Sequence, residues 1–316
     1  MRPLVTIGIS TYNRADGYLQ GALLSALKQG YPNLEIVVSD NGSTDHTESF
    51  VKSFEDPRVR YFKQEENIGA VANFDFCLEQ AQGAYFLLLH DDDLIDPDFV
   101  EACMSAVGDD TSLGIIRTGT RVIDDDGKTV AHNPNRMRGL TTADFFVNWF
   151  TKKTAIYFCS TLFNTQLLKD MGGLQTRTNV FEDVVAIARL SARHGRGDVY
   201  ENKASFRIHG SNKGSTFNSI NDWAEDSHYL LDVLCEEMPG DAERLLEVGK
   251  PYLCERLYRY ASKLPDMGER VRTYLWAYRS FDYSASPLRY LARQKVLQAK
   301  AVARKLLKER RTVQPA

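Results

Sequence analysis

The sequence predicts an α/β protein built on a parallel sheet with helices on both faces. Short apolar and β-branched runs alternate with helix-like segments over the first 120 residues, which is typical of a parallel sheet. Two of these runs, 4–9 and 34–39, each close in a polar turn. A third run, 84–89, is almost wholly apolar, as expected for a strand that is buried on both faces.

The expected elements follow in chain order. The first part predicts strands 4–9, 34–39, 59–62 and 84–89, helices 18–29 and 67–80, and a further helix after a cap at Thr44 or Asp45. The middle predicts a hairpin of 120–124 and 128–131, strand 155–164, helix 182–194 and strand 199–209. Beyond Ser215 the pattern is wholly helical. We therefore expect two parts, 1–215 and a helical region 216–316.

Composition excludes several classes of protein. With 43% hydrophobic and 26% charged residues, the chain is neither disordered nor of low complexity. A net charge of −3 argues against a general nucleic-acid binder. The five cysteines are odd in number and form no CxxC motif, so a reducing cytoplasm is the simpler expectation. We expect no signal peptide, and no apolar run approaches the ~18–20 residues of a membrane span.

Polar residues gather where three of the predicted strands end, at the edge where parallel sheets bind ligands. They are Thr11-Tyr12-Asn13, Asp40-Asn41 and His90 to Asp93. The adjacent carboxylates Asp91, Asp92 and Asp93 repel one another unless a cation neutralises them. Mg²⁺ and Mn²⁺ prefer such oxygen ligands and share them with phosphates. This segment is therefore either a metal–diphosphate site or a solvated acidic loop that caps the next helix.

Four other residues have both a functional and a structural interpretation. Asp40 suits a contact to a nucleotide base or ribose, but equally a turn. Glu182 and Asp183 begin a helix, where acids are favoured by the helix dipole without any catalytic role. His209 could hold a metal or a phosphate, or be structural. The chain has neither GxGxxG nor GxxxxGK[ST], so a dinucleotide fold or a P-loop is not indicated.

Together these segments resemble the family 2 glycosyltransferases, whose fold is GT-A, a Rossmann-like nucleotide-binding sheet flanked by helices. The likeness runs from Val5 to about Ser215. It consists of six segments in the family's order: 6–14, 35–45, Asn67-Ile68-Gly69 with Asn73, Asp91-Asp92, Glu182-Asp183 and Arg207-Ile208-His209.

The resemblance implies an inverting transfer of a sugar from a nucleoside-diphosphate-sugar to a hydroxyl of a glycan or lipid-linked acceptor, in cell-surface polysaccharide synthesis. It implies Mn²⁺ or Mg²⁺ as cofactor. We expect a UDP- or dTDP-sugar donor because Asp40 could accept the imide N–H of uracil or thymine. The implied nucleotide-binding residues are Thr11, Tyr12, Asn13, Arg14, Asp40, Asn67, Gly69, Asn73 and Asp91. The implied metal ligands are Asp92, Asp93 and His209, and the implied general base is Asp183 with Glu182 beside it.

Two departures from the family pattern leave details open. His90 stands where the family often has the first aspartate of its metal motif, so the carboxylates that touch the metal are uncertain. Ala72 precedes Asn73 where the family often has a basic residue, a role that Arg14 could take over. Two other functions stay open. A nucleotidyltransferase is disfavoured because 10–14 lacks glycine, and a non-catalytic nucleotide-sugar-binding protein is disfavoured because Asp92 and Asp183 are both present.

The C-terminal segment 288–316 contains nine basic residues and one acidic residue, Glu309. One helical face carries Ala292, Val296, Ala299, Ala303, Leu306 and Leu307, and most of the cations fall on another. Such a helix over 288–311 either lies on an anionic membrane surface or packs on the protein or on a second copy of the chain. We therefore expect a cytoplasmic protein, with peripheral association at the inner face of the membrane and homo-oligomerisation as the two options for this segment.

Overall fold

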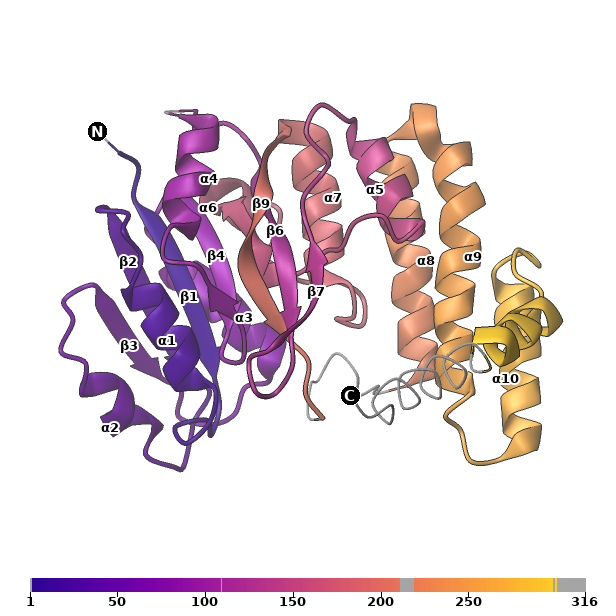
Figure 1. Ribbon diagram of the computed structural model, residues 1–316, viewed down its shortest axis with the longest axis horizontal. Helices are drawn as coiled ribbons and strands as arrows, with labels where there is room; N and C mark the ends of the chain where they lie inside the picture. Colours follow the sequence, from indigo (N-terminus) through magenta and orange to yellow (C-terminus); the bar gives the residue numbers. More distant parts are fainter. Residues whose placement is uncertain (1, 109, 211–218, 298, 300–316) are drawn as a thin grey trace, which may run out of the picture.

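The computed structural model describes residues 2–108, 110–210, 219–297 and 299. A twisted sheet with helices on both faces is followed by a layer of C-terminal helices (Figure 1). The strands are β1 (Val5–Thr11), β2 (Leu34–Asp40), β3 (Val59–Lys63), β4 (Tyr85–His90), β5 (Leu94–Ile95), β6 (Ile115–Ile123), β7 (Thr129–Asn133), β8 (Thr161–Asn164) and β9 (Arg196–Arg207). This confirms the predicted α/β class and the helical C-terminal region.

The helices occupy most of the connections between the strands. They are α1 (Leu19–Leu27), α2 (Thr47–Lys52), α3 (Ala70–Gln80), α4 (Phe99–Val107), α5 (Thr142–Phe150), α6 (Thr165–Asp170), α7 (Glu182–His194), α8 (Ile220–Glu237), α9 (Ala242–Ala261) and α10 (Met267–Ser280). Two short 3₁₀ helices, η1 (Phe158–Ser160) and η3 (Pro239–Asp241), lie between these elements. Asp45 accepts a hydrogen bond from the Thr47 amide at 3.0 Å, but the N-cap of α2 is His46, which makes no side-chain cap bond, so the predicted cap at Thr44 or Asp45 is wrong by at least one residue.

The sheet is mixed, although its first four strands are parallel as predicted. Its order is β3-β2-β1-β4-β8-β6-β9-β5, and β7 pairs with β6. β8 runs antiparallel to both β4 and β6, and β5 runs antiparallel to β9. β6 and β9 are parallel and lie side by side (Figure 1). The direction of β8 depends on where the chain re-enters the sheet, which no local pattern specifies.

Three of the expected boundaries in the middle of the chain are wrong. The hairpin is present, but β6 begins at Ile115 rather than at Thr120. The expected strand 155–164 is extended β-structure only from Thr161. Phe158 precedes it in a 3₁₀ turn and packs against Phe74 and His90, so its apolar character reflects a buried loop. The last strand, expected over 199–209, spans Arg196–Arg207.

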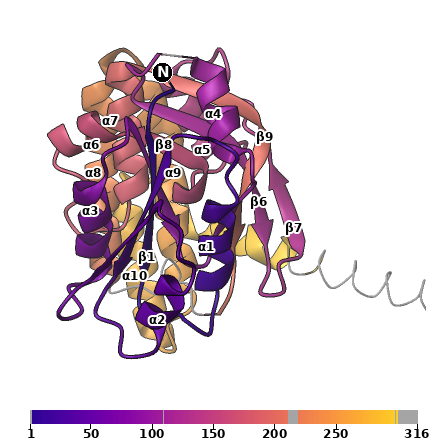
Figure 2. The same cartoon turned by 90° about the vertical axis from the view of Figure 1, so that its left-hand side faces the viewer.

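The sheet separates two hydrophobic cores. Along β4, Phe86 and Leu88 face the core formed with α3, α5, α7 and the C-terminal helices, because side chains alternate along a strand. The neighbouring Leu87 and Leu89 face the other core, formed with α1, α2 and α4. Figure 2, which views the sheet from its β1 side, shows α3 and α1 on opposite faces. Both faces of β4 are therefore buried in hydrophobic cores, as its apolar run predicts.

The helix α5 has a signal that the sequence prediction overlooked. Thr141 and Asp144 form a reciprocal capping box at its first turn, and such a pair is readable from sequence. Phe145, Phe146 and Trp149 then form one buried face. Through this face α5 joins α7 to the C-terminal helices.

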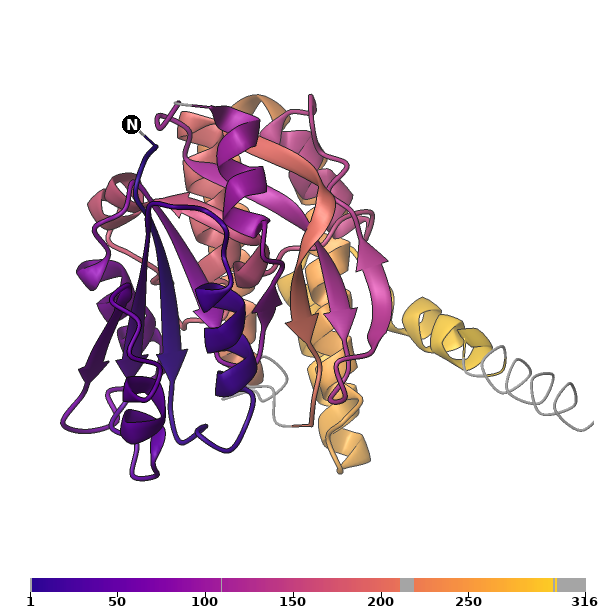
Figure 3. The same cartoon turned by 60° about the vertical axis from the view of Figure 1, so that its left-hand side comes forward.

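The C-terminal helices α8 and α9 pack on α5 and α7 and share one hydrophobic core with them (Figure 1). Residues 287–297 form a further helix, which Figure 3 shows in yellow reaching out from this layer. Tyr290 packs it against Tyr258 and Tyr274, while Val296 on the predicted apolar face is exposed. Most of the predicted basic helix 288–311 lies outside the described residues, and within those residues no helix has the length and apolarity to cross a membrane.

A buried carboxylate on α8 fastens the loop that leads into α7. Asp226 has no exposed surface. One of its oxygens accepts a hydrogen bond from the Thr178 amide at 3.0 Å, and the other accepts from the Val180 amide at 2.7 Å and from the Thr176 hydroxyl. The helical C-terminal region therefore determines the path of the chain directly before Glu182 and Asp183.

Asp226→Asn is expected to lower the free energy of unfolding by about 2 kcal/mol or more. The amide group that replaces one oxygen is a donor, and it would face a backbone N–H donor whichever way it turns. Urea denaturation measures the loss, and the exposed Asp232 on the same helix supplies the control Asp232→Asn. Equal stability of the two variants would show that the loop does not depend on this carboxylate.

Candidate active site

The acidic turn after β4 is tied to two other strands through its carboxylates. Asp91 accepts a hydrogen bond from the Thr11 hydroxyl at 2.8 Å, at the end of β1. Asp93 is buried and accepts the Arg207 amide at 2.9 Å, at the end of β9. His209 Nε2 lies 2.8 Å from a carboxylate oxygen of Asp92. Residues that are more than 110 positions apart therefore meet at the carboxyl edge of the sheet.

Burial, together with the gathering of negative charge, raises the pKa of two carboxyls in this turn. Burial raises the pKa of Asp91 to about 6, and the negative charge of Asp92 adds to the effect. Burial and the same charge also hold the pKa of Asp93 well above its ordinary value. A divalent cation relieves this repulsion directly, because it stabilises the ionised form of each carboxylate.

His90 joins the carboxylates in a group that can hold a metal. Ligand atoms of His90, Asp92 and Asp93 all lie within 4.8 Å of one another. The His90 ring stacks on Phe74 at 5.0 Å, and its Nε2 has no hydrogen-bond partner among the described residues. Burial lowers the pKa of His90, so the ring is neutral and can offer a lone pair. The sequence pattern treated His90 as a departure, whereas the structure places it within the cluster.

Arg207 fixes the geometry around this turn. Its guanidinium donates to the backbone carbonyls of Asp92, Asp124 and Asp125. It also lies over the Tyr18 ring, 4.6 Å from the ring centre, and the Tyr18 hydroxyl donates to Asp125. The loop of the β6–β7 hairpin, the start of α1 and the acidic turn are thereby held together.

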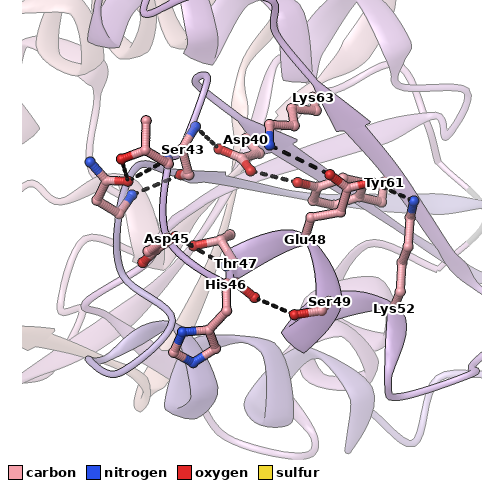
Figure 4. Close-up of polar contacts among 12 residues, drawn as sticks. Asp40, Ser43, Asp45, His46, Thr47, Glu48, Ser49, Lys52, Tyr61 and Lys63 are labelled. Carbon is pink, nitrogen blue, oxygen red and sulfur yellow. Dashed lines mark hydrogen bonds and ion pairs between the residues drawn. The ribbon is translucent and has the colours of Figure 1, made fainter.

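The segments after β1 and β2 form one connected loop pair. Asn13 adopts a positive φ of 52°, and its amide oxygen accepts a hydrogen bond from the Thr44 amide at 2.8 Å. Figure 4 shows Asp40 between Ser43 and Tyr61. Asp40 has no exposed surface, and its two oxygens accept from the Ser43 amide and the Tyr61 hydroxyl. Asp40 therefore organises this loop pair, and a direct contact to a base stays a prediction.

The side chain of Asn73 is likewise hydrogen-bonded within the protein. It is buried, accepts a hydrogen bond from the Ser39 hydroxyl at 2.6 Å and donates to the Ser10 hydroxyl at 2.8 Å. It thus joins α3 to β1 and β2. By contrast, Tyr12 is 39% exposed, and Arg14 lies close enough to Asp91 for its charge to lower the pKa of that carboxyl.

A cavity of about 1250 Å³ separates the acidic turn from the start of α7. Four of the predicted site residues line it, Gly69, Asp93, Glu182 and Asp183, and His90 lines it with them. The other predicted site residues are absent from its lining among the described residues; these are Thr11, Tyr12, Asn13, Arg14, Asp40, Asn67, Asn73, Asp91, Asp92 and His209. The structure thus brings the predicted base and part of the predicted metal site to one cavity, and leaves the predicted nucleotide loop outside its wall.

The two acids at the start of α7 have raised pKa values because they are partly buried in the cavity wall. Burial raises the pKa of Glu182 to about 7, and that of Asp183 to about 6. Asp183 accepts the Val184 amide at 2.8 Å, and the positive charges of Arg256 and Arg117 moderate its shift. A carboxyl with a pKa near the working pH suits general-base catalysis.

The C-terminal helices supply a wall of the cavity that the sequence analysis did not identify. Trp223 on α8 and Tyr252 and Arg256 on α9 all line it. No sequence motif marks these positions, since each side chain is an ordinary member of an amphipathic helix. They become part of the site only because α8 packs on α7 and α9 packs on α5 and α8.

Residues 6–172 match the family model described as Glycosyl transferase family 2. The chain belongs to this family. It is 35% identical over 136 residues to a chondroitin synthase of Escherichia coli, which covers 42% of this chain and 19% of that protein. It is 39% identical over 101 residues to an uncharacterized glycosyltransferase of Haemophilus influenzae, covering 31% of this chain and 40% of that protein. The chain therefore spans less than half the length of these curated relatives.

Solved structures with similar folds confirm the GT-A architecture. TarS of S. aureus aligns with a TM-score of 0.64 at 18% identity, covering 92% of this chain and 50% of that chain. The mannosyltransferase PcManGT of Pyrobaculum calidifontis, in complex with GDP-Man and Mn²⁺, aligns with a TM-score of 0.55 at 19% identity, covering 99% and 83%. The chain thus combines membership of glycosyltransferase family 2 with a GT-A fold and a helical C-terminal region.

Asp183→Asn is expected to stabilise the protein above about pH 6. The raised pKa of Asp183 means that wild-type stability falls as pH rises from the ordinary value of 3.8 to about 6, because the folded chain keeps the proton longer. Asparagine removes this penalty, which is on the order of 1–3 kcal/mol at pH 7 to 8. Below about pH 4 the two proteins should be equally stable.

Urea denaturation at pH 4 and pH 8 measures this difference. Asp170→Asn, which changes an exposed carboxyl outside the cavity, is the control and should leave the profile unchanged. A variant that is less stable than wild type at pH 8 would contradict the raised pKa of Asp183.

Proposed function

We propose that the chain is an inverting, metal-dependent glycosyltransferase that moves a sugar from a nucleoside-diphosphate-sugar to an acceptor hydroxyl. The observation that supports this most is the single cavity with His90 and Asp93 on one side and Glu182 and Asp183 on another. A metal-binding group and a base are the two chemical functions that a direct displacement at the anomeric carbon needs. Membership of the family provides the reaction class.

The donor side of the proposal rests on the acidic turn. A divalent cation held by Asp92, Asp93 and His90 would neutralise the charge that develops on the departing diphosphate. His209 and Arg207 keep the turn in place through Asp92 and Asp93. We propose that Thr11, Arg14 and Asp91 face the nucleotide, and that Asn13 and Asp40 shape its loop. Because His90 adds a nitrogen ligand, the set suits Mn²⁺ better than Mg²⁺.

The acceptor side rests on Asp183. The acceptor hydroxyl attacks the anomeric carbon, its proton passes to the Asp183 carboxylate, and the bond to the diphosphate oxygen breaks. A single displacement inverts the anomeric configuration and needs no carboxylate nucleophile. We assign the base to Asp183 because the family resemblance places the base at this position, and Glu182, which lines the same cavity, is the alternative.

The curated relatives and the similar solved structures suggest which donors and acceptors to test first. TarS has been solved with UDP-GlcNAc and PcManGT with GDP-Man, so both nucleotide classes belong in a first donor panel. A chondroitin synthase is among the relatives, which supports a glycan acceptor and a role in cell-surface polysaccharide synthesis. We further propose that 1–215 forms the catalytic part, and that 288–311 is the part to test for peripheral membrane contact or self-association.

Asp183→Asn should retain donor binding and reduce sugar transfer by about 100-fold or more, the range for loss of a general base. Wild-type kcat/KM should rise with pH around a midpoint near 6, because the base acts when ionised. An assay for released nucleoside diphosphate, with product analysis over the donor panel, measures the loss of transfer and the pH dependence of kcat/KM. Glu182→Gln is the matched comparison, and a larger loss in that variant would move the base to Glu182.

The same assay separates the alternative functions. A nucleotidyltransferase would release pyrophosphate from a nucleoside triphosphate, and a non-catalytic binding protein would bind a donor without turnover. Either outcome would overturn the glycosyltransferase proposal.

Asp92→Ala is expected to weaken Mn²⁺ binding by about tenfold or more, because the cation loses an oxygen ligand. His90→Gln should weaken Mn²⁺ binding more than Mg²⁺ binding, since only the softer ion gains from the imidazole. Electron paramagnetic resonance of free Mn²⁺ measures the affinity without turnover. Asp126→Ala, at an exposed carboxyl of the β6–β7 loop, is the control. Unchanged Mn²⁺ affinity in Asp92→Ala would remove this metal site.

A further inference from the structure

Arg256 is a preorganised cation in the wall of the cavity. Its guanidinium carbon lies 5.1 Å from the centre of the Trp223 ring and 5.8 Å from that of Tyr252. Its Nη1 donates to the Tyr252 hydroxyl at 3.2 Å. A guanidinium fixed by two aromatic rings loses little conformational freedom when it binds a ligand, and its planar fork of N–H donors matches a carboxylate or a phosphate.

Arg256 forms no ion pair with a carboxylate among the described residues, so its positive charge can attract a ligand. The neighbouring Glu255 is paired with Arg293 instead. Arg256 does lie close enough to Asp183 for its charge to lower the pKa of that carboxyl. The positive charge thus lies in the cavity beside the proposed base, where an acceptor must place its hydroxyl.

An anionic acceptor would need such a cation. Glu182, Asp183 and Asp93 line the same cavity, and their charges would repel a carboxylate or phosphate that entered it. Arg256 offsets this repulsion at one point of the wall and so selects where an anionic group can sit. Arg256 also lies outside residues 6–172, the part that matches the family, so its contribution is a property of this chain's helical region.

We propose that α8 and α9 form an acceptor subsite in which Arg256 binds an anionic group, a carboxylate or a phosphate, of the acceptor saccharide. This inference rests on the proposed function, since it assigns the substrate class of the same cavity. The anionic group would accept hydrogen bonds from the guanidinium while the reacting hydroxyl, on the same or the next sugar unit, lies at Asp183. Arg256 is a specificity-determining residue in this arrangement.

Direct binding and transfer test the proposal on the full chain. The acceptor probes are an oligosaccharide ending in a uronic acid, the same oligosaccharide with its carboxyl reduced to the alcohol, and a short glycerol-phosphate oligomer. Binding is followed by calorimetry with the nucleoside diphosphate and Mn²⁺ present, and transfer with the donor that wild type accepts. The first and third probes distinguish a carboxylate from a phosphate as the bound group.

Arg256→Gln should weaken binding of the anionic probe, and raise its KM, by about tenfold or more, as expected for loss of a hydrogen-bonded charge. Arg256→Lys should lose part of this affinity, because a point charge replaces the fork. Arg259→Gln, at an exposed arginine on the same helix, is the control and should match wild type. Thermal unfolding confirms that each variant is folded, and donor binding should be unchanged in all three.

The outcomes separate this inference from the proposed function. If wild type binds the carboxyl-reduced probe with the same affinity as both anionic probes, the subsite is wrong even where sugar transfer is found. The subsite is also wrong if wild type binds none of the three probes. If Arg256→Gln weakens the neutral and anionic probes equally, Arg256 is only structural and the subsite is again wrong. If wild type releases no nucleoside diphosphate from any donor, the function fails. Selective loss of anionic-probe binding in Arg256→Gln would then still support the subsite.

Discussion

Buried carboxylates at one edge of the sheet impose the main constraint on this structure. An ionised group inside a protein is costly unless hydrogen bonds or opposite charges stabilise it. Asp93 takes its hydrogen bond from the backbone of Arg207, and Asp91 takes one from Thr11. The mixed sheet, with β9 beside β6 and the β4 turn close by, is therefore what makes the acidic turn possible. Its residual repulsion is what a bound cation would relieve.

The helical C-terminal region completes the site. Asp226 on α8 holds the loop before α7 through the Thr178 and Val180 amides, and so determines where Asp183 lies. Arg256 on α9 moderates the pKa of Asp183 by its charge. The family match ends at residue 172, before all of these positions. The part of the chain most similar to its relatives thus supplies the acidic turn, while the less similar part shapes the space around the proposed base.

Hydrogen bonds within the protein explain why some residues of the motifs are available to a ligand and others are not. Asp40 and Asn73 belong to recognisable segments, yet both are buried and bonded to neighbouring strands and loops. His90 departs from the motif, yet one of its ring nitrogens lies with carboxylate oxygens of Asp92 and Asp93. A motif therefore locates the edge of the sheet at which chemistry can occur, and the packing around each side chain decides whether it is available to a ligand.

The sequence by itself determined the four parallel strands, the helix that begins at Glu182 and the acidic turn, because hydrophobic periodicity and turn residues are local signals. It could not determine the antiparallel entry of β8, the buried turn at Phe158, or the wall formed by Trp223 and Arg256. Those features depend on contacts between segments far apart in the chain. Only the tertiary structure decides them, because burial, and with it the pKa of each acid, is a property of the assembled neighbours.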